Sequence, residues 1–354
     1  MIILAIETSC DDTCVALLKT KEGKFPCFQL LSNIVSSQVK IHAKYGGVYP
    51  LLAKREHQKN LPIVLKKALK QAGNQKIDLI AVTVGPGLEP CLWTGINFAK
   101  ELAQKLKLPV APVNHIEAHI FANWLNSKFC IPNSKFLFPA ICLVVSGGHT
   151  QLILMKDFLK YKILGETRDD AAGECFDKVS RILGLGYPGG PAIAAEAAKL
   201  KTKNYKLKTN LPRPMIYQKN YDFSFSGLKT AVLYLTKQLT INNKHLTARQ
   251  KQEICAETQQ AIIDVLIHKT LKAVKEYRVK TLILGGGVAA NKELRKQLKL
   301  SVKKELPGSQ LLLPELKFTG DNAAMIAVAA YFHGRKSEYA ILSKLKANGN
   351  LKLI

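Results

Sequence analysis

The first feature that could carry chemistry is a pair of histidines four residues apart, in the run His115-Ile-Glu-Ala-His119. Asn114 is a good helix N-cap, and Glu117 three residues later is the residue type that completes a capping box. On the helix that begins there, the two imidazoles share one face. Such a pair can chelate a divalent metal, and the helix dipole favours the neutral imidazole that binds metals. The pair indicates either part of a metal site or two surface histidines at a helix end.

A metal site needs a further ligand, and the sequence offers two candidates. Asp321 lies at a junction between a loop and a helix, and His149 lies in the turn Ser146-Gly-Gly-His149. Glu117 should point away from the histidine pair, so we interpret it as structural. Separation along the chain does not reveal which of these side chains converge, and both candidates stay open at this point.

Glycine-rich turns form the second set of candidates, at Ser146-Gly-Gly148, Gly189-Gly190 and Gly285-Gly-Gly287. Glycine permits close backbone approach and positive φ. Backbone N–H groups in such turns, before helix N-termini, can bind phosphate or carboxylate oxygens. The chain has neither the P-loop pattern nor a spaced G-x-G-x-x-G fingerprint. Three such turns in one chain indicate a nucleotide held between two lobes.

Two further segments are rich in charge. Asp169–Lys178 is dense in carboxylates, and Asp177 could contact a ribose hydroxyl or form a salt bridge. Lys199–Lys219 mixes lysines with Tyr205 and Tyr217, a combination that suits RNA phosphates and unstacked bases. A merely solvated loop explains the second segment nearly as well.

The elements that must position these residues contain a repeated pattern. Strands predicted at 2–6 and 14–18 flank one polar turn, and strands at 140–145 and 151–155 flank another about 135 positions later. The rest alternates helices and strands with glycines at strand ends, which predicts an α/β protein with ligand loops there. We expect two duplicated lobes with a ligand cleft between them.

Charge limits the class of partner. The 354 residues carry 52 Lys and Arg against 26 Asp and Glu, a net charge of +26, and only eight of the 52 are arginines. Such a field attracts polyanions, of which nucleic acid is the commonest, although a lysine-rich composition also decorates solvated faces. No apolar run reaches the ~18 residues of a membrane span, and eight scattered cysteines without a C-x-x-C pair suit a reducing compartment. We expect a cytoplasmic protein without a membrane segment.

Together these motifs resemble the tRNA N6-adenosine threonylcarbamoyltransferase family, in its bacterial type, which has the two-lobed actin-like/sugar-kinase fold. The family's order is kept in Ile6–Asp12, Gly85–Leu88, His115–His119, Val145–Gln151, Asp169–Lys178, Tyr187–Pro191, Asp222–Thr230, Gly285–Asn291 and Gly320–Asn322. This chain departs from the pattern at Glu89–Trp93, where many members carry small residues, and at Asp12, where some carry Glu.

The resemblance implies an N-terminal actin-like lobe over residues 1–112, a C-terminal one over 113–320, and a C-terminal helix in 321–354 that packs back on the first. It implies transfer of a threonylcarbamoyl group from threonylcarbamoyl-adenylate to N6 of the adenosine 3′ of the tRNA anticodon, with release of AMP. A paralogous actin-like subunit and a small P-loop ATPase are the implied protein partners.

The resemblance also implies roles for individual residues. One divalent metal ion, expected to be Fe²⁺, would be bound by His115, His119 and Asp321. The expected catalytic residues are Asp11, Asp12 and His149, without an assignment of the general base. The donor would be held by Val144, Val145, Ser146, Gly147, Gly148, Asp177, Gly190 and Asn291.

Three other functions were weighed against this one. An ATP-dependent small-molecule kinase of the same fold could use Asp11 or Asp12 as its base, but hard Mg²⁺ prefers oxygen ligands to a histidine pair. A metalloprotease is disfavoured because Glu117 would lie on the wrong face of the helix. A non-catalytic RNA-binding scaffold would be expected to lack the two histidines.

Overall fold

The computed structural model describes residues 1–21, 26–125, 138–200, 210–241, 245–335 and 341–353, and contains two five-stranded mixed sheets. The first sheet has the order β3-β2-β1-β4-β5, from β1 (Ile2–Glu7), β2 (Asp12–Lys21), β3 (Cys27–Ser37), β4 (Leu79–Gly85) and β5 (Val110–Asn114). The second has the order β10-β9-β6-β7-β8, from β6 (Ala140–Val145), β7 (Thr150–Asp157), β8 (Lys160–Glu166), β9 (Thr281–Gly285) and β10 (Gln310–Leu312).

The two sheets have the same topology, which confirms the predicted duplication. In each, an antiparallel hairpin (β1 with β2, β6 with β7) continues into a third antiparallel strand on one side and two parallel strands on the other. β3 and β8, the third antiparallel strands, were not predicted, because their exposure is mixed and lacks a continuous apolar run.

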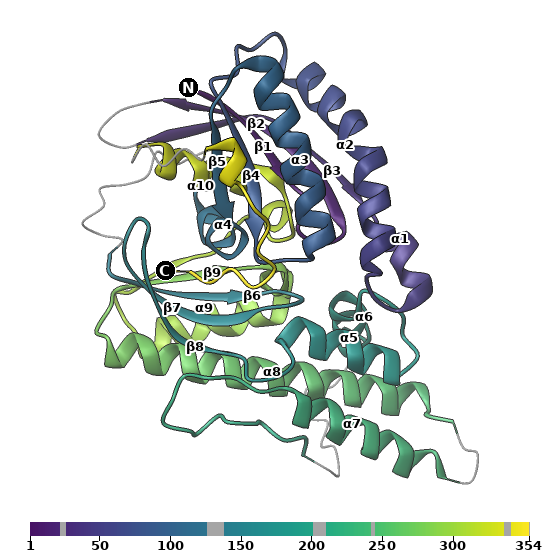
Figure 1. Cartoon of the computed structure of the whole chain (residues 1–354). Helices are drawn as coiled ribbons and strands as arrows, with labels where there is room; N and C mark the ends of the chain where they lie inside the picture. Colours follow the sequence, from purple (N-terminus) through teal and green to yellow (C-terminus); the bar gives the residue numbers. More distant parts are fainter. Residues whose placement is uncertain (22–25, 126–137, 201–209, 242–244, 336–340, 354) are drawn as a thin grey trace.

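Alternation along β1 explains how the layers form. Ile2, Leu4 and Ile6 face one side and pack with α2 (Pro50–Ala72) and α3 (Glu89–Leu106), whereas Ile3 and Ala5 face the other side. That second side packs against α4 (His115–Phe121), α10 (Ala323–Arg335) and the near face of the second sheet. The result is an α/β/α/β/α sandwich in which α4 lies between the sheets (Figure 1).

Five helices share one apolar core with the far face of the second sheet, and the long α8 crosses the lower part of Figure 1 above α7. They are α5 (Ala172–Ile182), α6 (Gly189–Ala198), α7 (Ser226–Leu239), α8 (Ala248–Glu276) and α9 (Lys292–Glu305). Helix α10 packs on the first sheet. The described residues 341–353 run along β4 without a long helix, and Asn348 N–H donates there to Val84 O at 2.9 Å.

The cysteines follow the sequence expectation with one exception. Seven of the eight lie in the part of the chain that the structure describes. Six of these are free thiols, whereas Cys27 on β3 is disulfide-bonded, which a chain without a cysteine framework did not predict. None of the described helices is long and apolar enough to cross a membrane.

Candidate metal centre and its surroundings

Helix α4 carries the two histidines on one face, as predicted. Its N-cap is Asn114, whose side-chain oxygen accepts from the N–H groups of Ile116 (2.8 Å) and Glu117 (3.2 Å). The imidazole rings of His115 and His119 lie 4.6 Å apart between centroids. The predicted capping box is wrong, because the Glu117 carboxylate faces His333 instead, with 2.6 Å between Oε2 and Nε2. All seven residues of α4 are buried, since the helix lies between two sheets.

Asp321 completes a cluster of three metal-ligand types. Its Oδ1 lies 3.5 Å from His115 Nε2 and 3.4 Å from His119 Nε2, and one ligand atom from each residue lies within 4.8 Å of the others. Asp321 lies two residues before the start of α10, so the packing of this last long helix brings the Asp321 carboxylate to α4. Of the two candidates for a third ligand, the structure brings Asp321 into the cluster.

The donor set fits a divalent metal. Both ring nitrogens of His119 are buried: Nδ1 has no hydrogen-bond partner among the described residues, and Nε2 faces Asp321 Oδ1 at 3.4 Å without a well-formed hydrogen bond. A buried imidazole is rarely left so, because its desolvation is then uncompensated. Two imidazole nitrogens and a carboxylate oxygen are the ligands of catalytic zinc and of non-haem iron sites.

Glu7 was not among the predicted site residues, yet it orients His115. This carboxylate at the end of β1 is fully buried; Oε1 accepts from Ser9 N–H and Oε2 from the Thr83 hydroxyl, both at 2.5 Å. Glu7 Oε2 also lies 3.2 Å from His115 Nδ1, which leaves Nε2 of that ring facing Asp321. A carboxylate behind a metal-binding histidine is a common supporting contact. The signal in the sequence was a lone Glu in an apolar strand.

The electrostatics of the cluster differ from the expectation based on the helix dipole. Burial lowers the pKa of His115, but the charges of Asp321 and Glu7 outweigh it and raise that pKa to about 9. Burial lowers the pKa of His119, despite its contact with Asp321. The dipole of one short helix contributes less than two carboxylates in direct contact.

The predicted catalytic residues approach this cluster from the corresponding turns of the two hairpins. Asp11 and Asp12 follow β1, and each has a buried carboxylate oxygen without a partner in the described chain. Burial and the charge of Asp321 raise the pKa of Asp12 to about 7. His149 follows β6, and burial together with the charges of His115 and His119 lowers its pKa to about 4.

Predicted donor-binding residues line the turn after β6. Val144 and Val145 are fully buried in opposite cores, so only their backbones are available to a ligand. Ser146 closes the turn, with its hydroxyl accepting from His149 N–H at 3.1 Å. Gly147 and Gly148 are exposed and have open space where a side chain would be. The turn therefore presents bare backbone.

The close backbone approach expected of glycine occurs at Gly173 and Gly286, which pack against the turn after β6, and not at Gly147 or Gly148. A Cβ on Gly173, at the start of α5, would lie 2.4 Å from Ser146 O, and a Cβ on Gly286, with φ of 89°, would lie 2.3 Å from Val145 O. Gly147 and Gly148 do not adopt positive φ. Gly173 therefore lets α5 begin against the turn after β6.

Asp177, Gly190 and Asn291 lie in the helical layer under the second sheet. Asp177 Oδ1 accepts from Gly189 N–H at 2.6 Å, at the start of α6 where Gly190 also lies. Asn291 caps α9 through Oδ1 and donates from Nδ2 to Gln259 at 2.8 Å, so one amide N–H is left for a ligand. Burial raises the pKa of Tyr187, as do the charges of Asp11 and Asp177, although Tyr187 was not among the predicted site residues.

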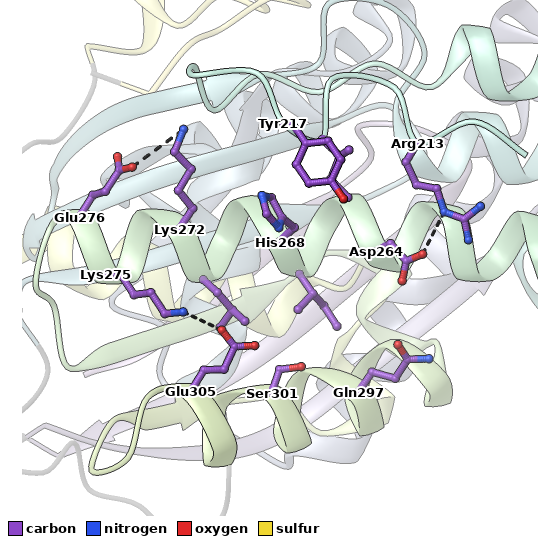
Figure 2. Close-up of a pocket in the computed structure, with 13 residues that line it drawn as sticks. Arg213, Tyr217, Asp264, His268, Lys272, Lys275, Glu276, Gln297, Ser301 and Glu305 are labelled. Carbon is purple, nitrogen blue, oxygen red and sulfur yellow. Dashed lines mark hydrogen bonds and ion pairs between the residues drawn. The ribbon is translucent and has the colours of Figure 1, made fainter.

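Part of the predicted RNA-binding segment Lys199–Lys219 lies outside the described residues, including Lys201, Lys203, Tyr205, Lys206 and Lys208. Its described part borders a cavity of about 700 Å³ between α8 and α9, shown in Figure 2. Arg213 there pairs with Asp264 at 3.0 Å, and Lys275 pairs with Glu305 at 2.6 Å. This cavity lies on the opposite side of the second sheet from α4 and is not part of the metal centre.

Comparison with known proteins agrees with this arrangement. A family model described as tRNA N6-adenosine threonylcarbamoyltransferase matches residues 29–328. A protein of that name from Thermosipho africanus is 49% identical over 100% of both chains, and one from Thermosipho melanesiensis is 50% identical over 94% of each.

Solved structures support the fold. HypF from T. kodakarensis matches with a TM-score of 0.56 at 16% identity, covering 97% of this chain and 49% of its own. Full-length HypF in its phosphate- and nucleotide-bound form gives 0.54 at 12% identity, over 95% and 46%. This chain thus spans about half the length of HypF, and the likeness concerns architecture alone. The sequence relatives decide the family: the chain belongs to the tRNA N6-adenosine threonylcarbamoyltransferases.

Proposed function

We propose that this chain transfers the threonylcarbamoyl group of threonylcarbamoyl-adenylate to N6 of the adenosine 3′ of the anticodon in tRNA, with the assistance of a metal ion. The observation that supports this most is the cluster of His115, His119 and Asp321 beside a turn of bare backbone, in a chain of this family. The names of the relatives favour neither a kinase nor a non-catalytic scaffold.

The proposed reaction is a nucleophilic acyl transfer. The N6 amine attacks the carbonyl carbon of the donor and forms the new N–C bond. The bond from that carbon to the phosphate oxygen breaks, AMP leaves with the electron pair, and the amine loses one proton. Negative charge develops on oxygen during this exchange, so the site must supply positive charge, N–H donors and a proton acceptor.

His115, His119 and Asp321 would hold the metal, which we expect to be Fe²⁺. A bound divalent ion supplies Lewis-acid stabilisation of negative oxygen. Gly147 and Gly148 can add backbone N–H donors, since no side chain covers them. The buried surroundings of His115 and His119 strengthen the interaction with the metal by excluding water.

The proton acceptor is best assigned to Asp12. One of its carboxylate oxygens is buried without a hydrogen-bond partner in the described chain, and its pKa of about 7 suits a base near neutral pH. Asp11 also has such an oxygen and serves as the alternative. His149, with a pKa of about 4, is a weak proton acceptor, and we assign it to donating a hydrogen bond.

The adenylate end of the donor would contact the remaining predicted residues. Gly190 lies near the N-terminus of α6, where backbone N–H groups favour phosphate oxygens. Asp177 can accept from ribose hydroxyls through its second oxygen, and Asn291 can use its remaining amide N–H. Val144, Val145 and Ser146 would contribute backbone only.

The macromolecular partners follow from charge and family. tRNA would bind mainly through lysines, so affinity should fall steeply with salt, with a log–log slope of about −4 for ~5 phosphate contacts. We propose a paralogous actin-like subunit and a small P-loop ATPase as protein partners, and a cytoplasmic location where tRNA is available.

Nucleoside analysis tests the proposed function. tRNA is incubated with this chain, threonylcarbamoyl-adenylate, Fe²⁺ and the candidate partner proteins, then digested and examined by mass spectrometry. We expect N6-threonylcarbamoyladenosine and an equal amount of AMP. An assay in which AMP forms while the tRNA stays unmodified would contradict the proposal, since the donor would then be hydrolysed rather than used.

A further inference from the structure

Two histidines outside the metal centre, His42 and His57, are completely buried, and the proposed reaction uses neither. His42 ends α1 (Val39–His42), and His57 lies in α2. Buried imidazoles are costly unless their nitrogens are hydrogen-bonded, so their partners indicate what they do.

His57 holds the turn that follows β1. Its Nε2 lies 3.0 Å from Cys10 O, which only accepts, so Nε2 carries the proton. Its Nδ1 then accepts from the Thr13 hydroxyl at 2.8 Å. One ring thus contacts the residues on either side of Asp11 and Asp12.

Gln38 links His57 to His42. Gln38 Nε2 donates to Ala53 O at 3.3 Å and, more weakly, to His57 Nδ1 at 3.4 Å, while its Oε1 accepts from His42 Nε2–H at 3.0 Å. The backbone N–H of Gln38 donates to Asp11 O at 3.0 Å. Gln38, which is only 1% exposed, therefore makes a second contact with the turn that His57 also contacts.

The far end of this chain of hydrogen bonds lies in a segment that contacts the other half of the molecule. His42 Nδ1 accepts from Tyr49 N–H at 3.3 Å, just before α2 begins. Between His42 and Tyr49 lies Gly46, whose carbonyl accepts from Arg181 of α5. A Cβ on Gly46, with φ of 66°, would lie 3.2 Å from Arg181 Nε, so the guanidinium packs directly on this backbone.

We infer that His42, Gln38 and His57 form a directed hydrogen-bond relay that positions the turn Cys10–Thr13, and through it Asp11 and Asp12, relative to the segment that α5 contacts. All three act as positioning residues. Each carboxylate of Asp11 and Asp12 has one buried oxygen without a partner among the described residues, so its placement relies in part on how the backbone of the turn is held. The functional part of the inference rests on the proposed function, whereas the relay itself does not.

The direction of the relay can be tested without activity. Histidine-selective ¹⁵N labelling and NMR should show both His42 and His57 as the neutral tautomer protonated on Nε2. Their signals are assigned with His42→Gln and His57→Gln. A tautomer protonated on Nδ1 at either ring would overturn the relay, because Cys10 O or Gln38 Oε1 would then lack a donor.

The positioning role is tested with His57→Leu in a single-turnover transfer assay. Displacing a catalytic group by about 1 Å can cost 10²-fold, so we expect the rate constant to fall by about 100-fold. The dissociation constants for Co²⁺ alone and for tRNA should stay within about twofold, because the relay touches neither ligand set. His57→Gln, whose amide can still donate to Cys10 O, should stay within about fivefold of wild type.

The matched control is His268→Leu, which makes the same change at an exposed histidine of the cavity in Figure 2 and should leave the rate unchanged. A wild-type rate in His57→Leu would overturn the inference. Equal losses of rate and of Co²⁺ affinity would also overturn it, since they would show general support of the site. If His57→Leu does not fold, the Gln variant and the NMR tautomers decide. Failure of the wild-type chain to modify tRNA would contradict the proposed function and leave the tautomer result standing.

Discussion

Two pairs of buried histidines lie on either side of the Cys10–Thr13 turn, and they differ in what their nitrogens contact. His42 and His57 have a partner from the chain at each nitrogen. His119 is equally buried, yet its Nδ1 has no hydrogen-bond partner within the described residues and its Nε2 faces Asp321 without a well-formed hydrogen bond. The chain provides a partner for every nitrogen of His42 and His57, whereas it leaves His119, and the Nε2 of His115 that faces Asp321, for a ligand. Unsatisfied buried atoms therefore distinguish a binding centre from a supporting network of the same residue type.

The cavity of Figure 2 sharpens this contrast. It is spacious and lined with charged side chains, yet Lys275, Glu305, Arg213 and Asp264 are paired among themselves. Volume and charge alone do not mark the functional site of this protein. The metal centre is recognised by buried ligand atoms of His115, His119 and Asp321 that converge without well-formed hydrogen bonds among themselves.

The strongest test of the contrast is His119→Ala. Loss of one of three ligands should lower metal affinity by at least about 100-fold, since changes to supporting residues alone cost 10–100-fold. Transfer activity should fall in parallel. Isothermal titration with Co²⁺ and nucleoside analysis measure the two effects. Unchanged metal content in the purified variant would refute the ligand role.

The second test concerns Glu7, which is not a candidate metal ligand itself but contacts the ligand His115. Glu7→Gln keeps the shape but weakens the acceptor for His115 Nδ1–H, and we expect metal affinity to fall about 10–100-fold. Thr83→Val is the matched control, because it removes one hydrogen bond to Glu7 and leaves the carboxylate in place. Titration with Co²⁺ checks both variants, and equal affinities in the two would show that Glu7 merely fills space.

The third test separates the architecture of the turn after β6 from its exposed backbone. Gly173→Ala should destabilise by roughly 1–3 kcal/mol, because its Cβ meets the backbone of Ser146 and Gly147. Gly148→Ala meets nothing within 4 Å and should change stability by less than about 0.5 kcal/mol. If the donor lies on this turn, Gly148→Ala should weaken its binding nonetheless. Denaturant unfolding and donor titration report the two effects, and unaltered donor affinity would remove Gly148 from the site.

Much of the fold was predictable because it depends on local patterns. The apolar runs around two polar turns predicted the duplicated hairpins, and the glycines after β4 and β9 marked the ends of parallel strands. Helix α2 runs from Pro50 to Ala72 with Pro62 inside it. β3 was missed because its side chains alternate poorly between buried and exposed, and its pairing with β2 decides its conformation.

The site was predictable only where spacing carries information. The spacing of His115 and His119 predicted a shared face, but Asp321 lies about 200 residues further on, and only the packing of α10 brings it near. Glu7 and His57 have ordinary surroundings in the sequence. Their importance arises from tertiary contacts with Thr83 and Cys10, which no local pattern encodes.

The smallest expected effect is a change in how stability depends on pH, and it tests the pair of histidines whose nitrogens are all hydrogen-bonded, His42 and His57. Burial lowers the pKa of His57, with Glu7 opposing and His42 reinforcing the shift. The unfolded chain therefore binds a proton more readily than the folded one below pH ~6.5, so stability is present above that value and is lost as pH falls towards the folded-state pKa. One such group contributes at most about 1.4 kcal/mol per pH unit.

Urea unfolding between pH 7.5 and 5 should show a shallower slope of unfolding free energy against pH for His57→Leu than for wild type. Leu61→Val on the same helix should lose about 1 kcal/mol and keep the wild-type slope. Parallel slopes in His57→Leu and wild type would mean that His57 gains its proton without breaking the relay, and the two pairs of histidines would then not differ in the way proposed.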